Sequence, residues 1–283
     1  MRMNHGAVWG VALGAGLLMT GEARAFDCLV EPSQVVELRS PVDGIVAAVH
    51  ARRGDQVRKG QVLVELQSAA ERSAVDAARF RAEMGGQIAS ARSRLDYATL
   101  KARRATELQR ENFASTQARD EADAERRLAE SELAAAIEGR DLARIDFRRA
   151  EETLALRTLA APFNGVVLDR MLHPGDLAEA GAGRKPVLRV AQIDPLNVDI
   201  VLPAALHASV KIGAKATVTP RGAPTAVQAT VSVVDRVIDA ASGTFVVRLE
   251  LPNPRYSILG GVRCTADIVG VPRPDDGRRI KGK

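Results

Sequence analysis

Residues 40–46 read Ser-Pro-Val-Asp-Gly-Ile-Val, and residues 161–167 read Ala-Pro-Phe-Asn-Gly-Val-Val. A Gly-Asp pair follows each stretch, so four residues recur at an offset of 121: Pro41, Gly44, Gly54 and Asp55 return as Pro162, Gly165, Gly175 and Asp176. Short β-type runs separated by turn residues surround both copies. Each copy is too small to hold a hydrophobic core by itself. The repeat therefore predicts one β domain that is assembled from two halves.

A long helical segment separates the two halves. Residues 68–155 contain no proline and are rich in Ala, Arg and Glu, which favours helices. A break is expected near residues 112–116, where Ser115 or Thr116 is a good N-cap, and Gly85-Gly86 is expected to bend the first limb. The segment therefore predicts two antiparallel helical limbs. Each limb would be about 60 Å long at 1.5 Å per residue.

Apolar residues at seven-residue spacing predict the seam along which the limbs pack. On the first limb they are Ile88, Leu95 and Ala102, with Met84, Ala91, Ala98 and Ala105. On the return limb they are Leu128, Ala135 and Leu142, with Ile145 three residues further on. Small alanine side chains in this seam would let the two helices approach closely.

The chain returns to a β pattern after the second half of the repeat. Alternating runs near residues 198–202, 216–219, 229–234, 244–251 and 264–269 predict a small barrel, with one short helix at 204–210. The expected domains are a split β domain of residues 26–67 and 157–193, a helical hairpin of 68–156 and a β-barrel of 194–270. The fold class is thus mainly β with a long α-helical hairpin, in an elongated chain, and residues 271–283 are expected to form a disordered tail.

The N-terminus predicts a secretory signal peptide over residues 1–25, with cleavage after Ala25. A short basic start precedes an apolar run over residues 7–19, and Ala23 and Ala25 are small residues at the positions that a signal peptidase reads. The alternative is an uncleaved membrane anchor. Export would place Cys28 and Cys264 in an oxidising compartment, where they either form a disulfide or stay as two free thiols.

Composition argues against several classes of function. The net charge of +5 is mild, and the arginines alternate with acidic residues without aromatic partners, so we expect no nucleic-acid partner. The histidines (His5, His50, His173 and His207) have no metal-ligand spacing, and neither a catalytic Ser motif nor a phosphate loop is present. We therefore expect no enzyme activity, no metal and no cofactor.

The combined motifs resemble a known family. The split halves, the inserted hairpin and the following barrel, with Ser-Pro-Val-Asp-Gly at 40–44, Gly-Asp-Gln-Val-Arg-Lys-Gly-Gln at 54–61 and Ala-Pro-Phe-Asn-Gly at 161–165, resemble the HlyD-like periplasmic adaptor proteins. These are the membrane fusion proteins of bacterial tripartite efflux and secretion systems. The resemblance implies a split lipoyl-like domain, a coiled-coil hairpin and a β-barrel domain.

The resemblance also implies a function and partners. The chain would link an inner-membrane efflux transporter, of the proton-driven RND type, to an outer-membrane channel, and it would form a homo-oligomeric ring of six copies. The alternative partner is an ABC-type exporter or a type I secretion system. Arg104, Leu108 and Ser115 have the Arg-x3-Leu-x6-Ser spacing that is similar to the family's channel-docking motif at the hairpin tip. The other interpretation of these three residues is a solvated charge, a seam residue and a helix cap.

A lipoyl or biotinyl carrier subunit is the alternative from another class, because lipoyl-like domains can carry such a group on a lysine of an exposed hairpin. In this chain the helical segment is inserted at that hairpin. No lysine lies between Gln67 and Leu100, and Lys101 is far along the helical limb. The sequence therefore disfavours the carrier function.

Overall fold

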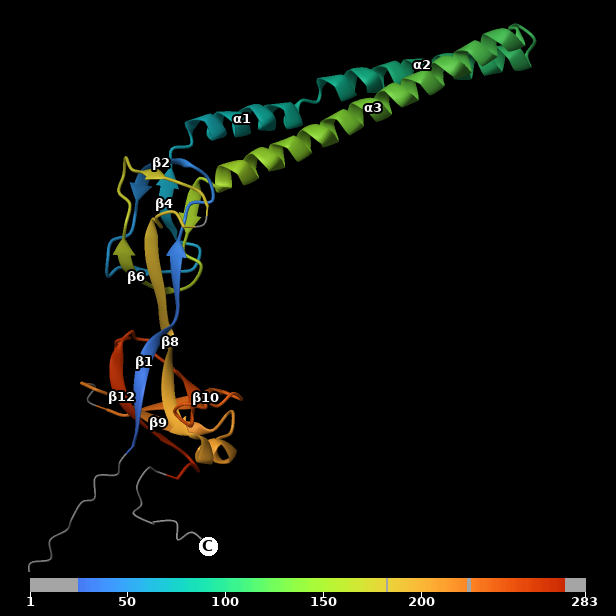
Figure 1. Cartoon of the computed structure of the whole chain (residues 1–283). Coiled ribbons are helices and arrows are strands. Elements are labelled where there is room, and N and C mark those ends of the chain that lie inside the picture. The colour runs from blue at the N-terminus through green and yellow to red at the C-terminus, as the bar shows by residue number, and fades with distance from the viewer. Residues whose placement is uncertain (1–24, 182, 223–224, 273–283) are drawn as a thin grey trace, which may run out of the picture. The chain divides into compact units, whose positions relative to one another are not determined.

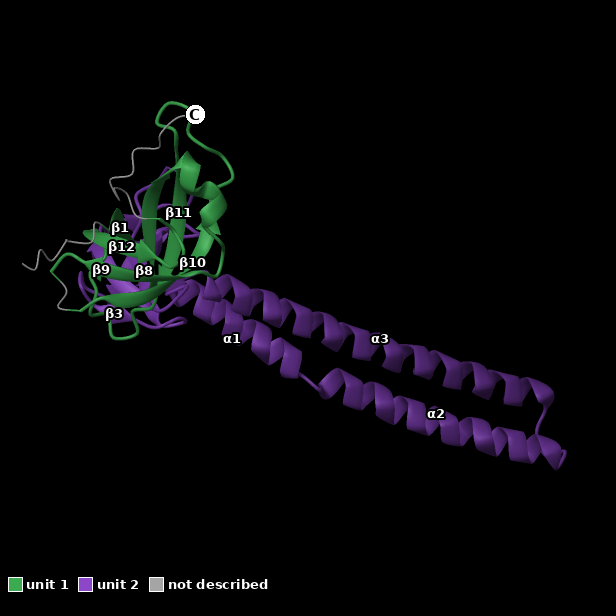
Figure 2. Cartoon of the chain, turned by 90° about the horizontal axis from the view of Figure 1, so that it is seen from below, with its two compact units in different colours: residues 1–31, 195–283 green, residues 32–194 purple. Residues whose placement is uncertain are grey.

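The computed structural model describes residues 25–181, 183–222 and 225–272. The chain divides into two compact units, which consist of residues 1–31 with 195–283 and of residues 32–194 (Figure 2). The predicted signal peptide of residues 1–25 lies outside the described residues except for Ala25. The predicted tail lies outside them from residue 273 onward.

The second unit, residues 32–194, contains the repeated β domain and the helical hairpin (Figure 1). One sheet has the strand order β5-β4-β2-β7, and β3 pairs with β6, which pairs with the first part of β8. The strands are β2 (Gly44–Val49), β3 (Gln56–Val57), β4 (Val62–Leu66), β5 (Thr158–Ala160), β6 (Gly165–Arg170), β7 (Leu177–Ala178) and β8 (Leu188–Pro203). Each half of the repeat thus supplies strands to both sets of pairings.

Buried side chains from both halves form one core in this unit. Leu63 and Val64 of the first half and Val187, Leu188 and Val190 of the second are fully buried in the same cluster. Removing this apolar surface from water is the main stabilising term that neither half could provide alone. The prediction of a split domain is confirmed.

The two halves also exchange equivalent hydrogen bonds. Gly54 N donates to Val167 O at 2.8 Å, and Gly175 N donates to Val46 O at 2.9 Å, with all residue pairs related by the 121-residue offset. Both glycines have a positive φ, 92° and 95°, which disfavours residues with a Cβ. In each half, the glycine of the Gly-Asp turn thus donates its N–H to a strand carbonyl of the other half.

The Asp of each turn fixes the loop before it. The Asp55 carboxylate accepts a hydrogen bond from Arg52 N, and the Asp176 carboxylate accepts one from His173 N, both at 2.7 Å. Such side-chain to backbone bonds stabilise tight turns and explain why aspartate follows the glycine in both copies.

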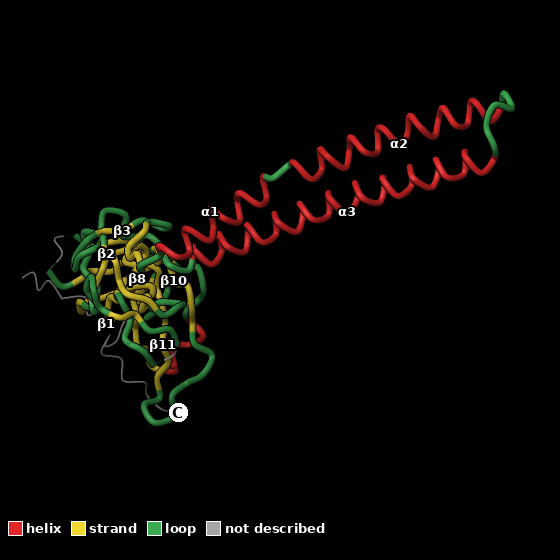
Figure 3. The backbone as a smooth tube through the Cα atoms, turned by 90° about the horizontal axis from the view of Figure 1, so that it is seen from above, coloured by secondary structure: helices red, strands yellow, loops and turns green. Residues whose placement is uncertain are grey.

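The hairpin comprises α1 (Ala69–Glu83), α2 (Gly86–Arg110) and α3 (Thr116–Ala155), and α3 runs alongside both other helices (Figure 3). The first limb is interrupted at Met84, which is extended, and Gly85, as the Gly85-Gly86 pair predicted. At the base, Arg157 Nη1 donates to Asp43 O at 2.8 Å and Nη2 to the Glu71 carboxylate at 2.5 Å. Arg157 therefore ties the start of α1 to the Pro-Val-Asp-Gly turn.

On the first limb, burial along the helices confirms the predicted seam except at Met84, which is 52% exposed. Ala91, Ala98 and Ala102 are buried there. On the return limb the prediction was wrong: Leu128, Leu142 and Ile145 are 62%, 60% and 52% exposed, and Ala135 is also exposed. The inward positions are a second heptad series, namely Ala122, Ala129, Ala136, Ala143 and Ala150 with Leu133, Phe147 and Leu154. Alanine every seven residues allows the limbs to approach closely, so small size and not large apolar area selects the inner face.

The first unit is a β-barrel with the strand order β1-β12-β9-β10-β11-β8, in which each consecutive pair is antiparallel. Its further elements are β1 (Phe26–Leu38), the 3-10 helix η1 (Ala204–Ser209), β9 (Lys215–Pro220), β10 (Val227–Val234), β11 (Thr244–Leu251) and β12 (Val262–Ile268). Ile200, Leu202, Val218, Val247 and Leu249 are fully buried in its core. The predicted barrel is confirmed.

The start of β1 differs from the domain limits expected from sequence. Residues 26–67 were assigned to the split domain, but Phe26 to Val30 pair with β12 in the first unit. Phe26, Cys28 and Val30 alternate inward, and Cys28 lies opposite Cys264 in the strand register. These two cysteines form a disulfide, with Cα atoms 4.8 Å apart. Alternating burial and the disulfide together hold the chain's first strand in the barrel.

Candidate functional site

The structure places Arg104, Leu108 and Ser115 at the far end of the hairpin. Arg104 and Leu108 lie four residues apart in the last two turns of α2, so they share one helix face. Ser115 immediately precedes α3, across the connecting loop. Leu108 is 47% exposed, so about half of its side chain is accessible at this end of α2.

The connecting loop has a defined conformation. Asn112 has a positive φ of 62°, Asn112 N donates to Gln109 O at 3.1 Å, and Phe113 N donates to Leu108 O at 2.8 Å. This pair of bonds after a left-handed residue is a Schellman motif, in which Asn replaces the usual glycine. The motif ends α2 and leaves the Phe113 ring 79% exposed at the tip.

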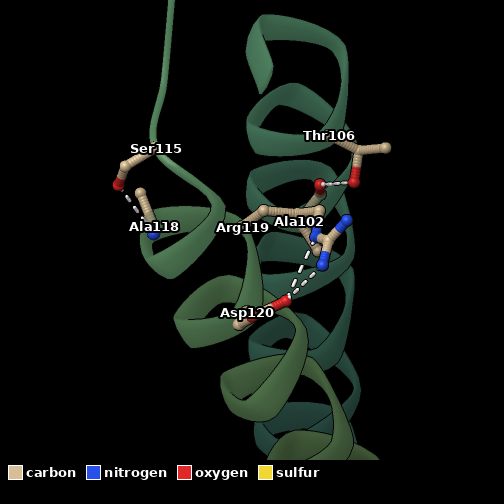
Figure 4. A network of polar contacts seen from close by, with 6 residues as sticks. All are labelled: Ala102, Thr106, Ser115, Ala118, Arg119 and Asp120. Carbon is tan, nitrogen blue, oxygen red and sulfur yellow. Dashed lines mark hydrogen bonds and ion pairs between the residues drawn. The ribbon is translucent and has the colours of Figure 1, made fainter. Parts of the chain in front are cut away.

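Ser115 caps the second limb. Its Oγ accepts a hydrogen bond from Ala118 N at 3.2 Å, which satisfies one of the free N–H groups of the first turn of α3 (Figure 4). In the next turn, Arg119 donates to the Asp120 carboxylate at 2.6 Å, and this hydrogen bond raises the pKa of Arg119. The serine of the predicted docking motif therefore has a structural role as the N-cap of α3.

A groove of ≈ 530 Å³ runs along the hairpin beside the tip. From α2 its walls take Tyr97, Leu100, Lys101, Arg104, Ala105 and Leu108, and from the loop and α3 they take Ala114, Ala118 and Ala122. The lining is mostly apolar, and on the α3 side it consists of small alanine side chains that leave room in the groove. Such a groove suits an apolar side chain or a helix edge from a partner.

The charges around the groove are not equivalent. Lys101 donates to the Glu125 carboxylate at 2.6 Å, which raises the pKa of Lys101, and Arg94 pairs with Glu132 at 3.3 Å. These two pairs join α2 to α3. Arg104, in contrast, is exposed and has no ion pair within the described part of the chain. Its guanidinium is therefore available to a carboxylate or carbonyl oxygen of a partner.

Sequence reasoning missed three apolar residues of this region. Tyr97 and Leu100 line the groove, and Phe113 is the exposed ring of the loop. Each is a large apolar residue outside the predicted seam, and this was the signal that could have identified them. The apolar surface around the tip is therefore larger than the three-residue motif indicates.

The other predicted residues lie elsewhere. Pro41, Gly44, Gly54 and Asp55, with Pro162, Gly165, Gly175 and Asp176, form turns and strand starts of the split domain, and Cys28 and Cys264 lie in the barrel. Within the described ranges, no group of three His, Cys, Asp or Glu side chains could hold a metal ion. Lys101, which the sequence already places too far along the limb for a carrier lysine, lies within α2 and is paired with Glu125.

No helix among the described residues has both the length and the apolar character to cross a membrane.

Comparison with known sequences identifies a family and several relatives that align with this chain over part of their own length. The family described as CzcB-like, barrel-sandwich hybrid domain matches residues 34–191, more than half of the 283 residues. The cobalt-zinc-cadmium resistance protein CzcB of Cupriavidus metallidurans is 26% identical over 227 residues, which cover 80% of this chain and 41% of CzcB. The multidrug export protein AcrE of Escherichia coli is 26% identical over 255 residues, which cover 86% of this chain and 63% of AcrE. The chain thus spans less than two thirds of the length of these relatives.

Solved structures show the same fold. MacA from Actinobacillus actinomycetemcomitans matches with a TM-score of 0.71 at 19% identity, over 88% of this chain and 78% of MacA. The membrane fusion protein Spr0693 from Streptococcus pneumoniae matches with a TM-score of 0.58 at 16% identity, over 86% of this chain and 96% of Spr0693. Together with the family match, these findings show that the chain belongs to the periplasmic adaptor, or membrane fusion, proteins of tripartite efflux systems, as a member with a CzcB-like barrel-sandwich hybrid domain.

Proposed function

We propose that this chain is a periplasmic adaptor that links an inner-membrane efflux transporter to an outer-membrane channel. The family consists of non-enzymatic adaptors, and we extend this to the chain itself, with no catalytic role. The signal peptide of residues 1–25 would direct export and be removed after Ala25. The observation that carries the proposal is the groove at the hairpin tip, with its exposed Leu108 and unpaired Arg104.

Arg104, Leu108 and Ser115 are assigned to docking on the helical end of the channel. Leu108 supplies an apolar contact, Arg104 a charge-assisted hydrogen bond, and Ser115 holds the start of α3 in place by capping it. Single contacts of this size are weak, but a ring of copies engages the channel several times at once, which multiplies the affinity. We propose a ring of about six copies, since closed rings of identical subunits permit such multivalent binding.

For the transporter we propose the proton-driven RND type, with an ABC-type exporter or a type I secretion system as the alternative. Two relatives are named as a cation efflux system protein and a multidrug efflux pump subunit, so cations and organic compounds are the two cargo classes to test. The type of transporter encoded beside the gene distinguishes the partner classes.

The test is export by cells that lack the native gene and produce either the wild type or a variant. Leu108→Asp places a charge in the apolar groove and is expected to abolish resistance to the exported compounds at unchanged protein level. Glu138→Leu, which changes an exposed position far from the tip, is the control for altered surface polarity. Normal export by Leu108→Asp would refute the docking assignment.

Ser115 needs a separate comparison, because capping and docking are both lost on mutation. Ser115→Asp retains a side chain that can cap, whereas Ser115→Ala removes the cap at a typical cost of about 1 kcal/mol. If capping is the essential role, Ser115→Asp exports normally and Ser115→Ala does not. Equal loss in both variants indicates direct contact with the channel.

A further inference from the structure

A second groove, of ≈ 620 Å³, lies on the outer wall of the barrel. Its lining comes from β8, β1, β12 and the end of β9, and all of these residues belong to one compact unit. In the barrel β12 lies between β1 and β9, and β1 also pairs with β8 (Figure 1). The groove therefore crosses four neighbouring strands of a single sheet surface.

Two arginines, Arg221 and Arg263, lie directly opposite each other at one side of this groove. Cys264 pairs with Pro220 in the register of β12 and β9, and at the next position Arg221 N donates to Arg263 O at 2.8 Å. Both arginines are exposed while Cys264 and Pro220 are buried, so the two arginine side chains point outward on the same face. The Cβ atoms of such opposite residues are roughly 5 Å apart.

The charges of this arginine pair are not neutralised by the chain. Neither guanidinium forms an ion pair within the described part of the chain, and like charges directly opposite each other destabilise a sheet. Arg248 on β11 differs, because it donates two hydrogen bonds of 2.7 Å to the Asp199 carboxylate. The barrel wall thus pairs one arginine internally and leaves two opposite arginines without an anion.

The strands that carry the arginine pair are cross-linked next to it. The disulfide between Cys28 and Cys264 joins β1 to β12 one residue before β12 continues to Arg263, and Pro220 directly precedes Arg221. Cross-linked strands keep the two arginines at a fixed spacing. A site that is already ordered loses little conformational freedom on binding, which favours affinity.

The opposite side of the groove is apolar. Leu29, the register partner of Arg263 on β1, is 38% exposed, and Val201 on β8 is 57% exposed. Asp27, which also lines the groove, lies two residues along β1 from Leu29 and forms no ion pair among the described residues. An anion is therefore favoured over the arginine pair and an apolar group over Leu29 and Val201.

We infer that this groove binds a phosphate-bearing ligand, with the phosphate between Arg221 and Arg263 and an apolar portion over Leu29 and Val201. The planar guanidinium fork donates two parallel hydrogen bonds to phosphate oxygens, and two arginines match the charge of a phosphate monoester, which is close to two negative charges at pH 7. A phospholipid head group and a free phosphate share this chemistry. The inference goes beyond the proposed function and does not depend on it.

The test is isothermal titration calorimetry on the whole mature chain at low ionic strength, with inorganic phosphate and dihexanoyl phosphatidic acid as probes. Each probe is expected to saturate one site per chain. Arg221→Gln and Arg263→Gln are each expected to weaken binding about tenfold or more, because each variant removes charge-assisted hydrogen bonds to the phosphate. Arg236→Gln, which removes an exposed charge between β10 and β11 of the same barrel, is the matched control and is expected to bind as the wild type does.

Val201→Ser distinguishes the two sources of phosphate. If the ligand is a lipid, phosphatidic acid binds more tightly than inorganic phosphate, and Val201→Ser weakens the binding of the lipid alone, by about fivefold. Equal affinities that Val201→Ser leaves unchanged assign the arginine pair to free phosphate. Both results support a phosphate site.

Three results would overturn the inference: no saturable binding of either probe by the wild type, unchanged affinity in both arginine variants, or tighter binding of a glutamate-rich peptide than of both phosphate probes. The third result would assign the arginine pair to an acidic protein partner. Thermal melting followed by circular dichroism checks that the variants fold. Because each arginine variant relieves repulsion between like charges, neither is expected to melt below the wild type.

Discussion

Replacing Gly165 by alanine should strongly destabilise the split domain. A Cβ at this position would overlap the carbonyl oxygen of Ala191, with the carbonyl carbon at 3.0 Å and a Phe163 ring atom at 3.2 Å. Ala191 belongs to β8 and is the register partner of Val166 in β6, so the obstacle is sheet backbone and cannot rotate away. Overpacking typically costs about 1–3 kcal/mol, and a backbone obstacle puts Gly165→Ala at the upper end, about 3 kcal/mol.

Gly44 is the equivalent glycine of the other half and provides a matched control. Its added Cβ would meet Arg157 Nη1 at 2.7 Å, which is the end of a flexible side chain. Displacing this guanidinium loses its bond to Asp43 O, at a cost of about 1 kcal/mol that the lower unfolded-state entropy of alanine partly offsets. The same substitution should therefore have unequal effects in the two halves.

Hydrogen exchange followed by mass spectrometry measures this difference directly, because slow exchange in core strands reports the free energy of opening. In peptides from β6 and β8, Gly165→Ala should lower the protection factors by about a hundredfold, since every 1.4 kcal/mol is a factor of ten. Gly44→Ala should lower them by about fivefold or less. Equal losses in the two variants would refute the steric argument.

Three further predictions follow from burial, charge and the disulfide. Ala98→Leu overpacks the inner seam and should lower the helical melting transition in circular dichroism by an amount that corresponds to about 1–3 kcal/mol, whereas Leu at exposed Ala89 should not. The pKa of the Glu71 carboxylate is lowered from its ordinary 4.5, first by a hydrogen bond from its own backbone N–H and then by the Arg157 guanidinium. The carboxylate therefore stabilises the hairpin above pH 4.5, and this stabilisation is lost as the pH falls through the lowered pKa. Glu71→Gln should remove this acid sensitivity when helicity is followed as a function of pH. Cys28→Ser removes the bond to Cys264 and should destabilise the barrel unit by about 2–5 kcal/mol in urea unfolding, and reductant should have the same effect on the wild type but none on the variant.

Much of the fold could be predicted from sequence because its main features are local or repeated. The offset between Gly54-Asp55 and Gly175-Asp176 reports a true structural equivalence, since both turns make the same hydrogen bonds with exchanged halves. Gly85-Gly86 and Ser115 mark a helix break and a helix cap through their own backbone and side-chain chemistry. Such signals do not depend on distant parts of the chain.

Which face of a helix or strand points inward could not be predicted from such local signals. On α3 two apolar heptad series coexist, and the larger residues Leu128 and Leu142 favoured the outward one. The alanine series faces inward because only its small side chains allow α1 and α2 to approach α3 closely. The pairing of Phe26 to Val30 with β12 likewise depends on a strand more than two hundred residues away. The tip groove requires both limbs and the loop in place before Tyr97 and Leu100 can be recognised as its walls.

The most direct test of the docking function is photo-cross-linking from the hairpin tip in living cells. A photoactivatable amino acid replaces Leu108 in one strain and Ile145, an exposed position near the hairpin base, in another. Cross-linked products are identified by mass spectrometry. We expect position 108 to capture an outer-membrane channel subunit and position 145 to capture none. Capture of the channel from both positions, or from neither while export is intact, would contradict it.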